Sequence, residues 1–159
     1  NSEFGINPAF VLAGIVMYPE RYGVIVTPNE YGDFLSDSAC GLIGSIGLGD
    51  SASYSFDEQG RVELAMFDPA GGTAPDIAGQ NLANPTAALL AFANLLRHVG
   101  ERRAGELQKR AILSALADGA RTGDIGGTLS TTEFTSEVIR RFTALAAAQP
   151  VASASPAKR

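Results

Sequence analysis

The order of helix-like and strand-like segments is the feature that most limits how this chain can fold. Apolar and β-branched patterns predict one helix, one strand, a second helix, two further strands and then three helices. Such alternation is typical of α/β proteins, in which helices cover a sheet. The strands are too few to complete a typical α/β sheet. We therefore expect a partial α/β fold, with a sheet completed by an N-terminal region or by another chain.

The N-terminal segments are predicted from caps and apolar runs. Asn7-Pro8 combines an N-cap with a proline at the first helical position, and the helix it opens runs to about Tyr18. That helix is apolar all round, so we expect it to be buried on nearly every side. Val24–Thr27 is a β-branched run typical of a buried strand. Residues 28–32 then read as a loop, and a helix is expected from Asp33 to Ile43.

The remaining segments are a hairpin, a long loop and three helices. Strands are expected at Ser51–Phe56 and Val62–Phe67, joined by a turn at 57–60. The loop from Asp68 to Asn84 is rich in glycine and proline, and loops of this length are usually functional or disordered. The three helices are expected from Asn84-Pro85 to His98, from Glu101 to Asp118, and from the capping box of Ser130 and Glu133 to Ala147.

Composition excludes several classes of function. The net charge of −5, without basic runs interleaved with aromatic residues, argues against a nucleic-acid partner. The longest apolar run, Phe10–Met17, is shorter than the roughly 20 residues of a membrane span. The single cysteine, Cys40, fits a reducing compartment, so we expect a cytoplasmic protein.

We expect one domain. Residues 7–147 carry the predicted elements and are long enough to bury a core. Residues 1–6 read as a linker or a cloning remnant. Residues 148–159, rich in alanine, serine and proline, read as a disordered tail.

Four segments carry a resemblance to a known family. They are Tyr22–Asp37 (YGVIVTPNEYGDFLSD), Gly47–Ser53, Phe67–Pro85 (FDPAGGTAPDIAGQNLANP) and Gly126–Phe134 (GGTLSTTEF). Together with the helices between them, they resemble the C-terminal portion of the isocitrate/isopropylmalate dehydrogenase family. The resemblance covers roughly Pro8 to Phe142, and the third segment is its most specific part.

Asp33 and Asp37 are the candidate metal ligands. Four residues apart, they share one face of a predicted helix, and carboxylate oxygens suit Mg²⁺ or Mn²⁺. The alternative reading is that both complement the helix dipole. The resemblance implies that these two positions hold the metal that chelates the substrate. Ala9 stands where the family has a further aspartate, and this loss should weaken metal binding.

The loop after Asp68 is the candidate cofactor site. Its small residues let backbone N–H groups approach a ligand closely. The resemblance implies contacts to the adenosine half of NAD from Gly72, Thr73, Ala74, Asp76, Ile77 and Asn84. An aspartate such as Asp76 can accept hydrogen bonds from ribose hydroxyls and would repel a 2′-phosphate. A glycine- and proline-rich loop that merely closes a domain is the alternative.

Other departures from the family affect the expected activity. Gly71 replaces a histidine that packs on the adenine side, Gly23 an aspartate and Glu30 an apolar residue. The family's substrate-binding arginines and its catalytic tyrosine and lysine belong to regions before this chain. The arginines present read instead as solvated helix faces, and the only histidine, His98, as a favourable charge at a helix end. We therefore assign no catalytic residue.

The resemblance implies an NAD- and metal-dependent dehydrogenase that oxidises and decarboxylates a 2-hydroxy acid such as isocitrate or 3-isopropylmalate. The isolated chain is expected to be inactive. A homodimer is expected through the helices at Pro8–Met17 and Asp33–Ile43. Two alternatives stay open: a non-catalytic dimerising or regulatory module, and an enzyme whose N-terminal part is a separate chain.

Overall fold

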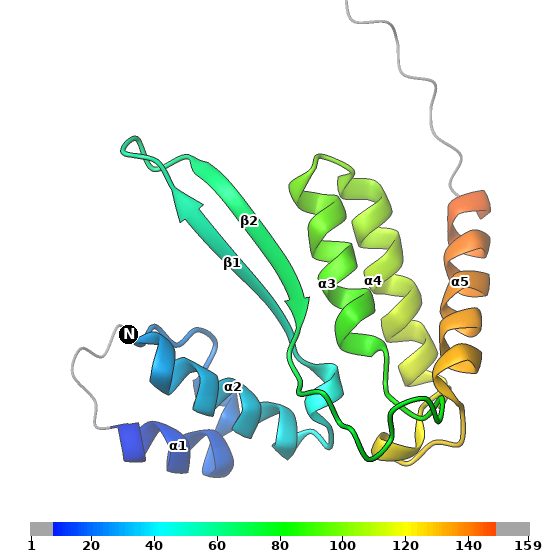
Figure 1. Ribbon diagram of the computed structural model, residues 1–159, viewed down its shortest axis with the longest axis horizontal. Helices are drawn as coiled ribbons and strands as arrows, with labels where there is room; N and C mark the ends of the chain where they lie inside the picture. Colours follow the sequence, from blue (N-terminus) through cyan, green and yellow to red (C-terminus); the bar gives the residue numbers. More distant parts are fainter. Residues whose placement is uncertain (1–7, 149–159) are drawn as a thin grey trace, which may run out of the picture.

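The computed structural model describes residues 8–148, in which helices outnumber strands (Figure 1). Two helices, α1 (Pro8–Met17) and α2 (Asn29–Leu42), lie beside the base of a hairpin formed by β1 (Asp50–Phe56) and β2 (Val62–Pro69). Three helices stand side by side on the other side of the hairpin: α3 (Thr86–His98), α4 (Arg102–Ala117) and α5 (Thr131–Ala148). Short 3-10 turns lie at Pro19–Arg21 (η1), Ile46–Leu48 (η2) and Gly123–Ile125 (η3).

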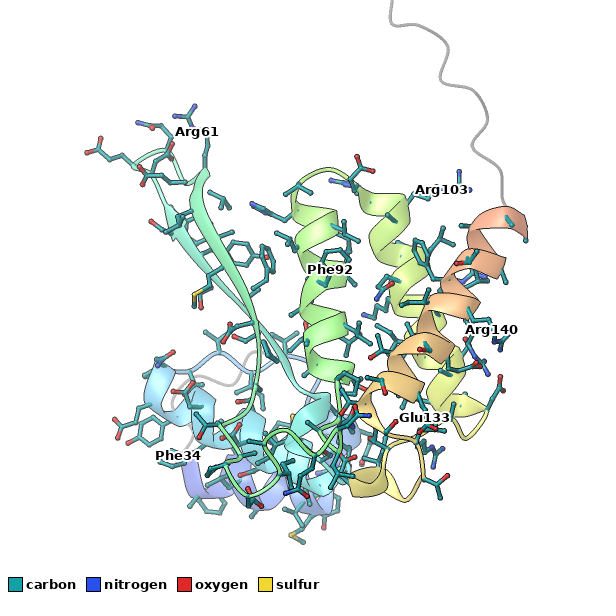
Figure 2. The ribbon with its side chains drawn as sticks, turned by 45° about the vertical axis from the view of Figure 1, so that its right-hand side comes forward. Phe34, Arg61, Phe92, Arg103, Glu133 and Arg140 are labelled. Carbon is teal, nitrogen blue, oxygen red and sulfur yellow. The ribbon has the colours of Figure 1, made fainter. Side chains whose placement is uncertain are left out.

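The sheet has two antiparallel strands, with Ser51 opposite Asp68 and Tyr54 opposite Ala65. The register shifts between Ser55 and Phe56, where the hairpin approaches its turn. The tip projects away from both helical groups, with Arg61 at its end (Figure 2). The Asp57 carboxylate holds this turn by accepting hydrogen bonds from the backbone N–H groups of Gln59 and Arg61. The predicted hairpin is therefore confirmed.

The hydrophobic core lies among α3, α4 and α5. Ala111, Ile112 and Ala115 of α4 pack against Phe134 and Val138 of α5, and each is at most 1% exposed. Leu89 and Leu90 of α3 and Phe142 and Leu145 of α5 extend this cluster. Burial of such side chains contributes about 1.5–3 kcal/mol each. The C-terminal helices therefore form the best-packed part of the described chain.

Gly105 permits the close approach of α4 to α3. A Cβ placed there would lie 2.6 Å from both the Ala93 carbonyl oxygen and Cγ of Arg97. A side chain at this position would push the two helices apart, and the interior packs too tightly to absorb that shift. On the α3 side of this contact lies another small residue, Ala93, which is 2% exposed.

The strand predicted at Val24–Thr27 does not form. This segment has no regular secondary structure, and Val24 and Val26 are 87% and 95% exposed. A β-branched run becomes a strand only when a neighbouring strand forms hydrogen bonds with its backbone N–H and C=O groups. No strand within residues 8–148 pairs with this segment. Two strands are therefore observed where three were expected, although the α/β character is retained.

Two further expectations about the N-terminal region were wrong. The second helix begins at Asn29 instead of Asp33, because the chain becomes helical directly after Pro28 and the Gly32 N–H already donates to the Pro28 carbonyl at 3.0 Å. Helix α1 is not buried on every side: its apolar side chains Phe10, Val16 and Met17 are 62–71% exposed. Both helices present apolar surface that nothing in residues 8–148 covers, including Phe34 on the outer side of α2 (Figure 2).

The predicted terminal segments fall mainly beyond the described residues. Residues 1–7, which include the expected linker and the N-cap at Asn7, lie outside them, as do residues 149–159 of the expected tail. Ala148, expected in that tail, is instead the last residue of α5. No helix between residues 8 and 148 combines the length and the apolar character needed to cross a membrane.

Candidate functional site

The loop between β2 and α3 is tied down at its start and at its end. Its first residue, Ala70, donates from its backbone N–H to the Gly49 carbonyl at 2.8 Å. Near its end, the backbone carbonyl of Asn81 accepts from the N–H of Thr131, while the Asn81 side chain bonds both the N–H and the hydroxyl of Thr132. The Thr131 hydroxyl donates to the Ala83 carbonyl at 2.5 Å. The loop end is thus docked on the N-terminus of α5.

The middle of the loop presents unused backbone donors. Gly71, Gly72, Thr73 and Ala74 follow one another, and their N–H groups have no hydrogen-bond partner within the described chain. All of these residues are exposed, and a Cβ at Gly72 would meet nothing within 4 Å. A run of free N–H groups on small residues can approach and bind an anionic or polyhydroxy ligand.

This segment is also held in an unusual backbone conformation. Gly71 has a φ of +149° and Ala74 a φ of +38°. Positive φ is costly for an alanine, so the surrounding structure must maintain it. The Ala74 carbonyl accepts from the Ile77 N–H at 3.1 Å, and the Gln80 side chain donates to the Asp76 carbonyl at 2.6 Å. These bonds close a turn that leaves the Asp76 carboxylate exposed and without a partner among residues 8–148.

The loop finishes at Asn84, whose side chain serves two elements. Its Oδ1 accepts a hydrogen bond from the Thr86 N–H at 3.0 Å, which caps the first turn of α3. Its Nδ2 donates to Oδ2 of Asp124 in η3, also at 3.0 Å. Gly47 leaves no room for a side chain against Asn84, since a Cβ there would lie 3.0 Å from the Asn84 Cβ. The half-buried Asn84 is therefore fixed from three directions.

Asp124 is a functional candidate that the sequence reasoning missed. Partial burial opposes its ionisation, but hydrogen bonds from Ser45, Thr122 and Asn84 outweigh that effect and hold the pKa of the carboxyl below its usual range. The Thr122 hydroxyl donates to Oδ1 at 2.5 Å. The only signal in the sequence is an aspartate inside a glycine-rich link, and that pattern has no periodicity to distinguish it.

Thr86 adds an orphaned polar group beside this cluster. The residue is 1% exposed, and its Oγ1 has no hydrogen-bond partner within the described part of the protein. Oδ1 of Asp68, near the end of β2, is likewise buried and has no hydrogen-bond partner within the described part of the protein. Buried polar atoms without partners are uncommon in folded proteins.

The candidate metal ligands Asp33 and Asp37 lie on α2, beyond its first turn, and both are exposed. Asp33 accepts a hydrogen bond from the Asn29 side chain at 3.2 Å. No set of at least three carboxylate, histidine or cysteine side chains suited to a metal is found in residues 8–148. The two carboxylates fit a hard cation as a pair of ligands, and they do not form a complete site by themselves. Glu30 lies in the first turn of α2, where its charge complements the helix dipole.

The end of α2 lies next to the start of the loop. A Cβ at Gly49 would come within 2.7 Å of the Cys40 sulfur and 3.2 Å of the Ala70 side chain. Burial, together with the nearby charges of Asp37 and Asp50, raises the pKa of the Cys40 thiol and disfavours its thiolate form. The candidate metal ligands and the candidate cofactor loop therefore belong to adjoining elements.

The arginines and the histidine take structural roles, and one of them is less exposed than expected. Arg97 and Arg140 form ion pairs at the surface, but the Arg141 side chain is only 18% exposed between Glu137 and Asp118. His98 is the last residue of α3 as predicted. Its ring lies 5.4 Å from Phe67 and 6.0 Å from Tyr54, centroid to centroid, in an aromatic cluster between helix and hairpin.

Comparison with known proteins explains this arrangement. The family profile described as isocitrate/isopropylmalate dehydrogenase matches residues 10–138. The chain belongs to the isocitrate/isopropylmalate dehydrogenase family. Members of this dehydrogenase family are oxidative decarboxylases. The match begins within α1 and ends within the first half of α5, so the loop and the paired aspartates both lie within it.

Individual relatives agree with the family assignment. The chain is 44% identical to an isocitrate/homoisocitrate dehydrogenase of Thermus thermophilus over 82% of this chain and 37% of the relative. It is 42% identical to a mitochondrial regulatory subunit of NAD isocitrate dehydrogenase from Dictyostelium discoideum over 81% and 35% of the two chains. The crystal structure of isocitrate dehydrogenase from Methylococcus capsulatus matches with a TM-score of 0.78 and 36% identity, covering 85% of this chain and 39% of that one. The chain therefore spans a little over a third of the length of these relatives.

Proposed function

We propose that this chain is the NAD-binding and partly metal-binding C-terminal portion of a dehydrogenase that oxidises and decarboxylates a 2-hydroxy acid resembling isocitrate or 3-isopropylmalate. The observation that carries the proposal is the run of four free backbone N–H groups from Gly71 to Ala74, on a loop anchored at both ends. Membership of the family supports the reaction class.

NAD fits the loop as a ligand. Gly72, Thr73 and Ala74 offer backbone donors, while Asp76 and Ile77 lie on the following turn. The free Asp76 carboxylate can accept hydrogen bonds from the ribose hydroxyls, and its charge opposes the 2′-phosphate of NADP. Asn84 closes the site at the start of α3. When bound, NAD accepts the hydride of the oxidation.

A divalent cation, Mg²⁺ or Mn²⁺, would be held by Asp33 and Asp37 together with ligands that this part of the chain does not supply. Such a cation polarises the oxygen of a hydroxy-acid substrate. Asp33 is already oriented by Asn29, which limits its rotamers. Because Ala9 adds no carboxylate, the contribution of residues 8–148 to the metal is limited to this pair.

The proposal also includes further strands that would extend the hairpin and a second copy of the chain. The hairpin has free strand edges and exposed apolar residues, which strands from an N-terminal region or from a separate chain would cover. The exposed apolar faces of α1 and α2 fit a homodimer interface. Dimerisation through these two helices would place Asp33 and Asp37 at the subunit boundary.

A non-catalytic regulatory module is the second candidate. Two observations favour it: the described residues hold only a pair of metal carboxylates, and one similar protein is named as a regulatory subunit. Such a module would keep the fold and the dimer surface. It would bind a nucleotide without turning over a hydroxy acid.

Titration of NAD into the isotopically labelled chain, followed by NMR, tests the loop assignment. We expect the amide resonances of Gly72, Thr73 and Ala74 to shift most. Gly72→Val should abolish the shifts without unfolding the chain, because a side chain there meets nothing within 4 Å and would occupy the space a dinucleotide needs. Gly23→Val, at another open glycine, is the matched control. Resonance shifts spread evenly over the chain, or unchanged by Gly72→Val, would contradict the proposal.

A further inference from the structure

A second cavity lies between the hairpin and the C-terminal half of α3, and it shares no residue with the candidate cofactor loop. Ala52 and Tyr54 of β1 form one wall, and α3 and the start of α4 form the other. Its volume is about 610 Å³, within the range of roughly 300–1,000 Å³ that is usual for small-molecule sites. The loop ends at the N-terminus of α3, whose 13 residues extend about 20 Å to its far end. The cavity is therefore a separate site.

Positively charged side chains line this cavity from two helices. Arg97 lies near the end of α3, and Arg102 is the first residue of α4. Nε of Arg97 pairs with the Glu106 carboxylate at 3.2 Å, while its two terminal nitrogens have no partner among residues 8–148. The guanidinium of Arg102 forms no hydrogen bond or ion pair with any described residue. Two guanidinium groups with unused N–H donors therefore meet at one cavity.

The segment around the cavity concentrates positive charge. Residues 97–110 contain five arginine and lysine side chains and two glutamates, a net charge of +3 in a chain whose net charge is −5. Arg102 and Arg103 open α4, whose first turn has no acidic residue, and the side chain of Glu101 makes no capping hydrogen bond there. Cations at a helix N-terminus oppose the helix dipole. A bound anion would offset both this effect and the repulsion between the guanidinium groups.

The other lining groups suit an anion that carries a ring. Tyr54 is 44% exposed, and its ring lies 6.0 Å from that of His98, centroid to centroid, so the two present aromatic surface to a ligand. The Asn94 side chain donates one amide hydrogen to Asp50 and keeps the other for a ligand.

A phosphate monoester fits this set of groups. It offers three acceptor oxygens, which two guanidinium groups can share, whereas a single carboxylate is matched by one. We propose that this cavity binds a small organic phosphate, with the phosphate between Arg97 and Arg102 and an attached ring against Tyr54. The proposal does not require that the loop binds NAD.

Phenyl phosphate is the probe, titrated into the chain by calorimetry at constant ionic strength. We expect saturable binding at millimolar concentration, several-fold tighter than that of inorganic phosphate, which lacks the ring, or of phenylacetate, which lacks the phosphate. Arg102→Gln should weaken the binding by about tenfold or more. It breaks no contact within the described residues, so the chain should stay folded. The matched control is Arg103→Gln, which removes the same charge from the next position of α4, outside the cavity lining, and should change the affinity by about twofold at most (Figure 2).

Tyr54→Leu separates ring recognition from charge. It should weaken the binding of phenyl phosphate and leave that of inorganic phosphate unchanged, with thermal melting to confirm that the variant is folded. In NMR spectra of the labelled chain, phenyl phosphate should shift the amide resonances of Tyr54, His98 and Arg102 and leave that of Gly72 in place.

Three results would overturn the proposal. The first is the absence of saturable binding, or binding no tighter than that of inorganic phosphate or phenylacetate. The second is an equal effect of Arg102→Gln and Arg103→Gln, which would mean that the anion is attracted by the overall charge of this end of the molecule. The third is a set of resonance shifts centred on Gly72, which would place the phosphate in the loop.

Discussion

Nδ2 of Asn84 lies 3.0 Å from Oδ2 of Asp124 and joins two segments separated by 40 positions in the sequence. Through this bond, the end of the candidate cofactor loop is attached to η3, which leads into α5. The same carboxylate also accepts a hydrogen bond from the Thr122 hydroxyl, so the link before η3 and the end of the loop meet at one residue. The candidate site is thus held by contacts between distant segments and is not a property of the loop alone.

The chain tested by itself should not reduce NAD with isocitrate, isopropylmalate or tartrate in the presence of Mn²⁺. It spans a little over a third of its relatives, and its described residues supply two carboxylates to a metal. The measurement is absorbance of the reduced cofactor under saturating substrate. Metal-dependent turnover that disappears in Asp33→Asn would contradict this expectation and establish that the chain is a complete catalyst.

The loop should prefer NAD to NADP, and Asp76 should be the cause. The exposed carboxylate has no partner within residues 8–148, so its charge acts directly on a 2′-phosphate. Asp76→Lys should weaken NAD binding several-fold and raise NADP affinity by about tenfold, since the replacement exchanges a repulsive for an attractive charge pair. Calorimetric titration of both cofactors measures this change.

The matched control for that charge reversal is Glu58→Lys at the exposed hairpin tip. It alters net charge by the same amount without approaching the loop. A gain in NADP affinity of equal size in the control would mean that overall charge, rather than Asp76, sets the preference.

Local sequence signals predicted most of the elements. The capping box is one example: the Ser130 backbone N–H donates to the Glu133 carboxylate at 2.8 Å, and the Glu133 N–H donates to the Ser130 hydroxyl at 3.3 Å. The hairpin and the ends of α3 and α4 were also within one or two residues of expectation. Such features depend on contacts between close neighbours, which the sequence displays directly.

Features that depend on distant partners were not predictable. Val24–Thr27 has the composition of a strand but lacks a neighbour to pair with, and α1 has the composition of a buried helix but lacks a cover within residues 8–148. The resemblance identified the loop and the two aspartates of α2. Asp124 was missed, because its importance lies in a hydrogen bond from Asn84, which is 40 positions away in the sequence.

Truncation of the core should unfold the C-terminal helices. Phe134 is completely buried against α4, so Phe134→Ala should lower the free energy of unfolding by about 3–5 kcal/mol. Ile139→Ala on the same helix is the control, since its side chain is 59% exposed and should cost far less. Urea denaturation followed by circular dichroism gives both values. Equal losses would show that α5 does not pack as described.

Stability should fall in acid partly through Glu137. Hydrogen bonds from Arg140 and Arg141 lower the pKa of this surface carboxyl from 4.5 to about 2. Because the pKa is lower in the folded state, the stabilisation is complete above the unfolded value and is lost as the pH falls from about 4.5 to about 2. Glu137→Gln should flatten the dependence of melting temperature on pH in this window. Glu63→Gln, which removes an exposed carboxyl on β2, should leave that dependence unchanged.

The chain should form a dimer through α1 and α2. Phe10 is 71% and Phe34 65% exposed, and such apolar surface on neighbouring helices is uncommon on a monomer. Phe10→Lys should dissociate the dimer, because a lysine ammonium would be buried in the apolar interface without a counter-charge. Val99→Lys, another apolar and exposed position at the end of α3, should leave the dimer intact. Sedimentation equilibrium at micromolar concentration decides between the outcomes. A folded monomer for the unmodified chain, or dissociation by both substitutions alike, would place the interface elsewhere and remove the argument that Asp33 and Asp37 lie at the boundary between subunits.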